Sequence, residues 1–367
     1  MASKVYFWNL RTSMKMPYAK RVKRLIKRSG VFAPIESKAL VAVKVHFGEA
    51  GATGFIAPIY IAPIVGLLVK TGARPFLADT NTLYTGQRYE GVSHALVAAR
   101  HGFDPSVLGA PVVIADGIRS RNAREVAIKG KHFKTCSIAG DFVDADVLVT
   151  LNHFKGHLLG GFGGALKNLA MGCATVKGKM QQHCDMGPTL IEKHCTGCGA
   201  CVAACLHGAL DLEGDKAAFL KEKCVGCGAC IHACEYDALQ IEWKENTPLF
   251  LERMVEYAAA ALASQEIKAH ITFVTNVSPG CDCEGHSDAP ICPDQGVLVS
   301  DDPVALDQAA LDRVNQAPPL YPSALPKGVQ PGDDKFMAVY PDIDGTHALA
   351  YAESMGLGLR DYELVKC

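Results

Sequence analysis

Apolar and polar positions recur along the chain with two different periods, which together predict a succession of strands and helices. Short runs rich in Val, Ile and Leu predict strands at 5–8, 40–45, 75–78, 112–115, 147–151, 269–275 and 296–299. Longer stretches with helical spacing predict helices at 17–29, 59–71, 90–101, 165–173, 249–264, 303–314 and 346–355. Alternation of this kind is typical of an α/β fold, with a mostly parallel sheet and helices on both faces. The proline-rich residues 316–332 predict a surface loop.

The middle of the chain contains an internal repeat. Residues 194–210 (HCTGCGACVAACLHGAL) match residues 223–239 (KCVGCGACIHACEYDAL) after a shift of 29 positions. Each copy reads Cys-x2-Cys-x2-Cys-x3-Cys. The cysteines are Cys195, Cys198, Cys201 and Cys205 in the first copy, and Cys224, Cys227, Cys230 and Cys234 in the second. This spacing, within a glycine-containing turn, lets consecutive thiolates point at one cubane cluster.

The repeat resembles the bacterial ferredoxin module that binds two [4Fe-4S] clusters, over about residues 191–243. The resemblance implies that one cluster is held by Cys195, Cys198, Cys201 and Cys234, and the other by Cys224, Cys227, Cys230 and Cys205. It also implies an α+β insert at 189–245, which divides the α/β fold into residues 1–188 and 246–367. Leu206 and Glu235 stand where the module normally has Pro, which changes the local turn and the reduction potential. The alternative, zinc held by four thiolates, would favour paired Cys-x2-Cys units.

Composition and charge narrow the function classes. Lys and Arg number 37 against 38 Asp and Glu, and the net charge of -1 excludes a globally basic protein that binds nucleic acid. The longest apolar stretch, residues 55–69, is interrupted by Pro58 and Pro63 and is shorter than the ~18–20 residues of a membrane span. Residues 1–10 show no secretory pattern, so we expect a cytoplasmic protein. In a reducing cytoplasm, 15 cysteines indicate metal ligation rather than disulfides.

Polar side chains follow five of the predicted strands. In chain order they are Lys44, His46, Glu49, Asp79, Thr80, Asn81, Asn152, His153, Lys155, His157, Asn276, Ser300, Asp301 and Asp302. Ligands of open α/β sheets bind beyond the carboxyl ends of the strands. We therefore expect these residues to form one shared pocket.

A glycine-rich segment, residues 152–173 (NHFKGHLLGGFGGALKNLAMGC), is the strongest candidate binding motif outside the repeat. Its glycines lead into a predicted helix that carries Lys167 and Asn168. Backbone N–H groups, a helix N-terminus and a cation together favour an anionic group. A glycine-rich turn that only allows close packing is the alternative. The spacing is not that of a nucleotide triphosphate loop.

Roles in the expected pocket follow from residue type. We assign proton transfer and anion binding to His46, Glu49, His153, Lys155, His157 and Lys167. We assign contact with the bound group to Gly160, Gly161, Gly163, Gly164, Asn168, Asp79 and Asn81. Metal ligation by the pair His153 and His157 is the alternative. The glycines form no flavin or nicotinamide fingerprint, although a flavin site needs no single motif.

Cysteines outside the repeat include a second group. Cys281, Cys283 and Cys292 lie in one polar loop after a predicted strand (NVSPGCDCEGHSDAPICPDQG). Together with Cys173 or a nearby His they make a candidate third metal site. The alternative is a redox-active or merely buried group of thiols.

Four segments together resemble an uncharacterised iron-sulfur-center family, the domain of unknown function three-hundred-and-sixty-two, in its ferredoxin-containing form. They are residues 44–58 (KVHFGEAGATGFIAP), 72–86 (GARPFLADTNTLYTG), 152–173 and 276–291 (NVSPGCDCEGHSDAPI). The resemblance implies an α/β domain with an inserted ferredoxin, common in anaerobes, and no established reaction.

These observations support an oxidoreductase in which two clusters relay electrons to a small anionic substrate or a cofactor in the α/β pocket. The alternative is an electron-transfer or maturation partner without a substrate of its own. A third class is a non-redox enzyme whose clusters are structural. A redox partner protein is expected in the first two cases. The basic first helix, with Lys20, Lys23 and Lys27, is either a docking surface for an acidic partner or a covering helix with a solvated face.

Overall fold

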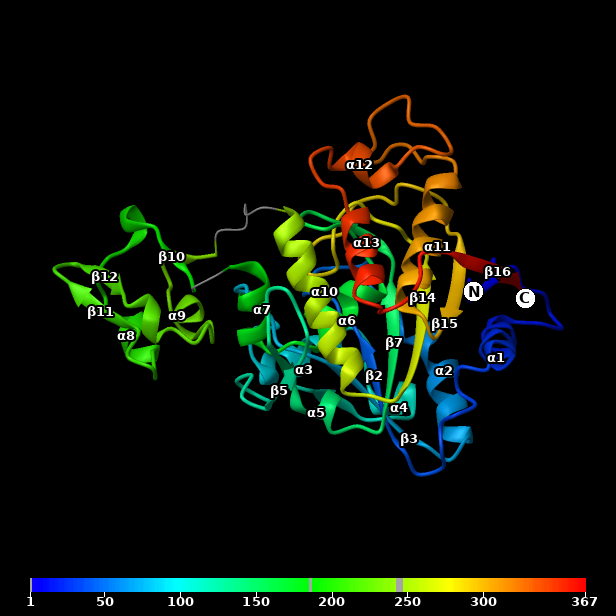
Figure 1. Ribbon diagram of the computed structural model, residues 1–367, viewed down its shortest axis with the longest axis horizontal. Helices are drawn as coiled ribbons and strands as arrows, with labels where there is room; N and C mark the ends of the chain where they lie inside the picture. The colour runs from blue at the N-terminus through cyan, green and yellow to red at the C-terminus, as the bar shows by residue number, and fades with distance from the viewer. Residues whose placement is uncertain (1, 185–186, 242–246) are drawn as a thin grey trace.

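The computed structural model describes residues 2–184, 187–241 and 247–367 (Figure 1). An eight-stranded sheet in the order β16-β1-β15-β14-β7-β2-β3-β4 forms its centre. The strands are β1 (Ser3–Trp8), β2 (Leu40–Val45), β3 (Arg74–Asp79), β4 (Val112–Ile114), β7 (Val147–His153), β14 (Ile267–Val274), β15 (Gly296–Ser300) and β16 (Tyr362–Lys366). The five strands from β14 to β4 pair in parallel, which confirms a mixed α/β fold with a mostly parallel sheet.

Helices cover both faces of this sheet because successive side chains of a strand point to opposite faces. In β7, Leu148 joins one hydrophobic cluster, whereas Val147 and Val149 join the other. The second cluster packs under α1 (Tyr18–Ser29), α2 (Pro58–Lys70), α3 (Gly91–Arg100) and α4 (Pro105–Leu108). The first packs under α6 (Ala165–Cys173), α10 (Thr247–Ala263), α11 (Pro303–Gln316) and α13 (Thr346–Ser354).

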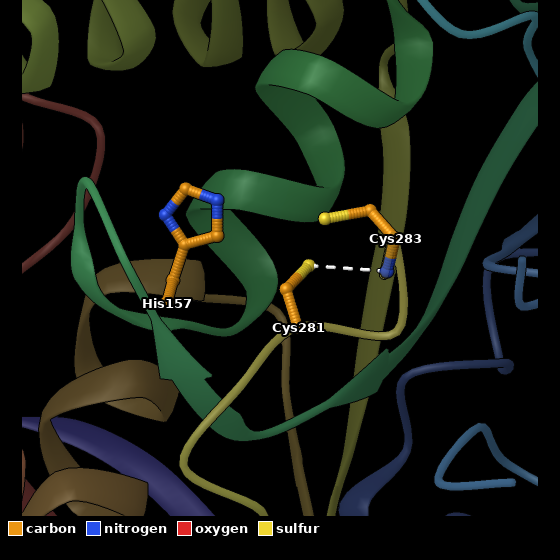
Figure 2. A group of neighbouring side chains, drawn as sticks. All are labelled: His157, Cys281 and Cys283. Atoms are coloured by element: carbon orange, nitrogen blue, oxygen red, sulfur yellow. Dashed lines mark hydrogen bonds between the residues drawn. The ribbon is translucent and has the colours of Figure 1, made fainter. Parts of the chain in front are cut away.

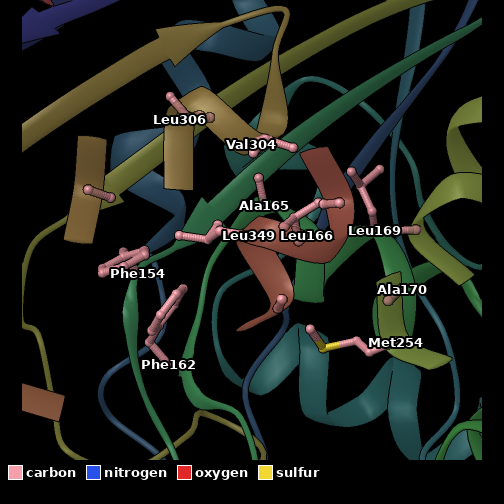
Figure 3. Packing of buried hydrophobic residues seen from close by; sticks show 14 of the residues in the cluster. Phe154, Phe162, Ala165, Leu166, Leu169, Ala170, Met254, Val304, Leu306 and Leu349 are labelled. Atoms are coloured by element: carbon pink, nitrogen blue, oxygen red, sulfur yellow. The ribbon is translucent and has the colours of Figure 1, made fainter. Parts of the chain in front are cut away.

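The packing of the first cluster is shown in Figure 3. Leu166 and Leu169 of α6 lie among Met254 of α10, Val304 of α11 and Leu349 of α13, all almost fully buried. Burying an aliphatic side chain of this size contributes about 1.5–3 kcal/mol. Helix α6, which forms the end of the glycine-rich segment, is therefore fixed in the core.

Several short elements have no clear signal in the sequence. They are β5 (Ala123–Ala127) and β6 (Thr135–Ala139), α5 (Gly140–Val143), β8 (Lys155–His157) and β9 (Gly161–Gly163), α7 (Val176–His183) and α12 (Lys335–Val339). Each has too few residues to show a period. Among the described residues, no helix is both long enough and apolar enough to cross a membrane.

Residues 187–241 contribute no strand to the large sheet and project beyond α7 (Figure 1). They form β10 (Thr189–Leu190) paired with β13 (Leu239–Gln240), and β11 (Leu210–Glu213) paired with β12 (Lys216–Phe219). Two short 3-10 turns, η1 (Glu192–His194) and η2 (Lys221–Lys223), precede α8 (Ala200–Ala204) and α9 (Ala229–His232) respectively. The same order of turn and helix in each copy reflects the sequence repeat.

This segment contacts the rest of the chain through a third, smaller core. Leu83, Val176 and Met180 pack there with Leu210 and Ile231. The ring of His232 lies 5.0 Å from that of Tyr89, and its Nε2 lies 3.1 Å from the carbonyl oxygen of Leu83. The contact is therefore made by α9 on one side, and by α7 and the loop after β3 on the other.

One part of the expected pocket is wrong. Strand β15 runs antiparallel to both β1 and β14, so its carboxyl end lies at the opposite edge of the sheet. Ser300, Asp301 and Asp302 therefore cannot join the polar residues that follow β2, β3 and β7. Asp302 instead caps α11, accepting hydrogen bonds from the backbone N–H groups of Val304 at 2.8 Å and Ala305 at 3.0 Å.

Candidate functional site

A cavity of about 390 Å³ lies where β2, β3 and β7 end. Parallel neighbours bring their carboxyl ends to one edge, so the polar residues after these strands converge. The predicted residues that line the cavity are His46, Asp79, Thr80, His153, Lys155, His157, Gly163, Gly164, Lys167, Asn168 and Cys283. Leu151, Leu158, Leu159 and Met171 give it an apolar wall. This combination is typical of a site for a small ligand that has both polar and apolar parts.

Some predicted residues lie behind the cavity wall. Glu49 accepts from the side chain of Arg88 at 3.3 Å, and Asn81 donates to Asp116 and to the carbonyl oxygen of Gly117. Gly160 and Gly161 face Gly345, since a Cβ on Gly161 would lie 3.2 Å from its nitrogen. These residues support the walls of the site rather than lining it.

Asp79 is the centre of a buried network of charges. Its carboxylate lies 3.0 Å from Lys44 Nζ, 3.3 Å from Arg88 Nη1 and 3.7 Å from His94 Nε2. Burial alone would raise its pKa, but the attraction of Lys44 and the nearby imidazole of His94 outweigh burial and hold the pKa well below its usual value. Asp79 is thus a paired, ionised group that organises the cations around it.

Asp282 fixes the cysteine loop against β7. Its Oδ2 lies 2.8 Å from His153 Nδ1 and 3.1 Å from Lys155 Nζ, and its side chain is almost fully buried. Burial alone would raise its pKa, but His153 and Lys155 outweigh it and hold the pKa well below the usual value. His153 Nε2 also lies 2.8 Å from the carbonyl oxygen of Thr275. Both ring nitrogens are thus engaged by protein oxygens, and among the described residues His153 joins no group that could hold a metal ion, so the structure does not support the His153–His157 metal pair.

Cys281, Cys283 and His157 meet at the side of the cavity (Figure 2). One ligand atom of each lies within 4.8 Å of the others, close enough to share a single metal ion. Lys167 Nζ lies 3.5 Å from Cys281 Sγ, and the backbone nitrogen of Cys283 lies 3.4 Å from the same sulfur. A hydrogen bond from the side chain of Cys283, helped by Lys167, lowers the pKa of Cys281 well below its usual value against the effect of burial. The same bond raises the pKa of Cys283.

The other two cysteines expected at this site lie elsewhere. Cys173 ends α6, where its sulfur lies 4.0 Å from the carbonyl oxygen of Asn168. Cys292 is fully buried in the first hydrophobic cluster. Within the described chain, Cys281 and Cys283 thus share a possible ligand group with a His, the alternative to Cys173 that the sequence offered, and Cys292 and Cys173 do not join it.

The glycine-rich turn does not present a free helix N-terminus. Asp307 of α11 accepts hydrogen bonds from the backbone N–H groups of Ala165 at 2.6 Å and Leu166 at 2.9 Å. A carboxylate from the same chain thus occupies the place that we expected for an anionic ligand. Lys167 and Asn168, one turn further on, still line the cavity.

Helix α7 supplies cavity residues that the sequence analysis did not identify. Lys179 and His183 line the cavity from this helix, and Arg88 lines it from the loop after β3. Burial lowers the pKa of Lys179 to about 8. Its Nζ donates to Thr80 Oγ1 at 2.6 Å and to the carbonyl oxygen of Ala174 at 2.7 Å. Recognition of α7 from Thr175, which caps it through Gly178 N–H at 3.2 Å, could have indicated these residues.

The structure sorts the cysteines of the repeat into two sets, each at a small cavity. One cavity is bordered by Cys195, Cys198, Cys201 and Cys234, and the other by Cys205, Cys224, Cys227 and Cys230. Within the described residues, no three of these sulfur atoms all lie within 4.8 Å of one another. Around one zinc ion, with Zn–S bonds of about 2.3 Å, tetrahedral sulfurs would lie about 3.8 Å apart. The described sulfur atoms are thus less tightly gathered than the four ligands of one zinc ion would be.

Comparison with known proteins identifies the family. The family model described as Domain of unknown function (DUF362) matches residues 41–312, which include β2, β7, β14 and β15. The chain belongs to this family. No curated protein matches this DUF362 chain.

Two solved structures show a weak likeness to this DUF362 protein. The lactate racemase apoprotein from Thermoanaerobacterium thermosaccharolyticum is 15% identical, with 74% of this chain and 51% of that chain covered and a TM-score of 0.38. A protein from Thermotoga maritima is 8% identical, with 72% and 52% covered and a TM-score of 0.38. This chain thus spans about half the length of each. A likeness this weak carries no argument about the chemistry here.

Proposed function

We propose that this DUF362 protein is an iron–sulfur oxidoreductase. Two [4Fe-4S] clusters in residues 187–241 relay electrons to or from a small anionic substrate in the cavity beside β2, β3 and β7. The observation that carries this proposal is the division of the repeat cysteines into two sets of four, one of which lies against α7. Each set mixes cysteines from both copies of the repeat, as two-cluster ferredoxins do.

The set Cys205, Cys224, Cys227 and Cys230 is the inner one. Met180 of α7 borders its cavity, and Lys179, the preceding residue, lines the large cavity. Leu83 also lies between the large cavity and the inner cysteine set. It lines the large cavity, and a Cβ on Gly228 would lie 3.4 Å from its side chain. A cluster held by this set would be separated from the substrate by about one layer of side chains, which favours electron transfer into the cavity.

Cations in the cavity support an anionic substrate. Lys155 is paired with Asp282, but Lys167 and Lys179 have no carboxylate within salt-bridge distance among the described residues. Both line the cavity, as do the apolar side chains of Leu151 and Met171. An organic acid with a short apolar body would satisfy both surfaces.

A redox partner would dock on the projecting segment. The basic helix α1 lies at the opposite end of the molecule (Figure 1). A protein bound to α1 would be far from both cysteine sets, so its basic face does not support docking of an electron donor. We assign that role to the surface around Cys198, which is exposed in the outer set.

The test is anaerobic purification, followed by iron and sulfide analysis. We expect about eight irons per chain, with roughly four lost in each of Cys198→Ser and Cys227→Ser. Protein reduced with dithionite is then mixed with a panel of small organic acids, and reoxidation of the clusters is followed by absorbance. Lys167→Ala should keep the cluster absorbance and lose this reoxidation. Zinc in place of iron, or reoxidation that is unchanged in Lys167→Ala, would contradict the proposal.

A further inference from the structure

We propose that Cys281 and Cys283 form a redox-active thiol pair, which accepts at the cavity the two electrons that the clusters deliver. This inference rests on the proposed function and deepens it, because it names the group that couples one-electron carriers to two-electron chemistry. The pair lies in the loop after β14, outside the repeat.

A tight turn brings the two sulfur atoms together. The backbone N–H of Glu284 donates to the carbonyl oxygen of Cys281 at 3.0 Å, which closes a turn that contains both cysteines. The sulfurs lie within 4.8 Å of each other. Asp282, the residue between them, is held by His153 at 2.8 Å and Lys155 at 3.1 Å. The turn is therefore anchored, while the sulfurs remain close enough to bond after a small rotation about the side chains.

Hydrogen-bond donors surround Cys281, which favours a thiolate over a metal-bound sulfur. Lys167 Nζ and the backbone nitrogen of Cys283 both approach its sulfur. His157 Nδ1 accepts from the backbone N–H groups of Gly160 at 3.0 Å and Leu159 at 3.3 Å. In the neutral ring the proton therefore sits on Nε2, the nitrogen that faces the thiols in Figure 2. A ring nitrogen that carries a proton donates to a thiolate and cannot ligate a metal ion.

The cavity gives the pair a place to react. Cys283 and Glu284 line it together with Lys155 and Lys167, and so does Lys179 of α7, the residue before Met180, which borders the inner cysteine set. Substrate, thiol pair and inner cluster would thus share one space. Cys292, also buried, lines no part of this cavity and provides a matched control.

The electron balance fits two clusters. Reduction of the Cys281–Cys283 disulfide breaks one S–S bond, takes one electron from each cluster and adds one proton from solvent to Cys283, while Cys281 is left as the thiolate beside Lys167. Oxidation reverses the step, returning one electron to each cluster. The clusters are the only reductant that the step needs.

The experiment is an anaerobic reductive titration of the cluster-loaded protein after mild oxidation with ferricyanide. Wild type and Cys292→Ser should take up about four electrons per chain, and Cys281→Ser and Cys283→Ser about two. Alkylation followed by mass spectrometry should find the disulfide only in the oxidised forms of the first two proteins. The ratio of disulfide to dithiol should change tenfold for each ~30 mV, as expected of a two-electron couple.

Three results would overturn the inference. One is uptake of about two electrons by the wild type, with both thiols free after oxidation. Another is uptake of about four electrons by Cys283→Ser as well. The third is one metal ion per chain beyond the cluster irons that both cysteine variants lose, which would assign the group to metal binding. Absence of cluster iron would instead contradict the proposed function. Alkylation would still show whether Cys281 and Cys283 form a disulfide on oxidation.

Discussion

Asp282→Asn should destabilise the protein strongly, because it removes one charge from a buried group of three. The carboxylate is 1% exposed and lies 2.8 Å from His153 Nδ1 and 3.1 Å from Lys155 Nζ. The amide keeps the shape of the side chain but leaves Lys155 buried without a counter-charge and removes the carboxylate that faces His153. Breaking a buried ion pair by removal of one partner costs about 3–5 kcal/mol, so we expect a loss of about 3 kcal/mol in the free energy of unfolding.

The assay is urea unfolding followed by far-UV circular dichroism, with an exposed ion pair as the control. Asp144 Oδ2 lies 2.6 Å from Arg124 Nη2, but these side chains are 51% and 46% exposed. Asp144→Asn should therefore cost at most about 1 kcal/mol. Equal losses in the two variants would refute the reasoning that burial, rather than pairing, sets the cost.

The pH dependence of Asp282→Asn follows from the direction of the pKa shift. The pKa of Asp282 is held well below its unfolded value, so the stability that its ionised form contributes is present above that unfolded value and is lost as the pH falls through the native pKa. The difference between wild type and variant should therefore fall as the pH drops below about 4, the ordinary pKa of Asp in the unfolded chain. A difference that is unchanged between about pH 5 and pH 3 would contradict a lowered pKa for Asp282.

Three further predictions follow from the same structure. Asp307→Ala should lower the free energy of unfolding by about 1–3 kcal/mol, because it leaves the first N–H groups of α6 without acceptors; unchanged urea unfolding would contradict this. Gly156→Ala should disrupt the contact between β8 and the cysteine loop and lower the free energy of unfolding in urea, because its Cβ would lie 1.8 Å from the carbonyl oxygen of Pro279. Gly66→Ala is the control: a Cβ there has no neighbour within 4 Å, so the free energy of unfolding should not fall, and equal losses in the two variants would contradict the prediction. Binding of a small organic acid, measured by calorimetry, should weaken as the pH rises through about 8, where Lys179 loses its charge; Lys179→Met should bind weakly at every pH, and an unchanged profile in that variant would exclude Lys179 as the cause.

The sequence by itself determined the order of the elements and the candidate chemistry of the repeat. Long apolar runs and helical spacing mark β2, β7, α6 and α11, because these elements bury a face over enough residues to show a period. The cysteine spacing of the repeat is likewise local, since each triplet lies in one turn. The hairpin of β8 and β9, with strands of three residues each, is too short to leave such a pattern.

The tertiary structure alone decided which residues share the site. Polar residues after β15 lie at the far edge because that strand is antiparallel, and a strand's direction does not show in its apolar pattern. Asp307 caps α6 across 142 positions, and Lys167 approaches Cys281 across 114. The period of apolar residues shows which face of one segment is buried. These contacts depend instead on which distant segments pack against each other. The sequence therefore identified the reactive residue types, and the packing of the sheet and its helices selected the partners of each.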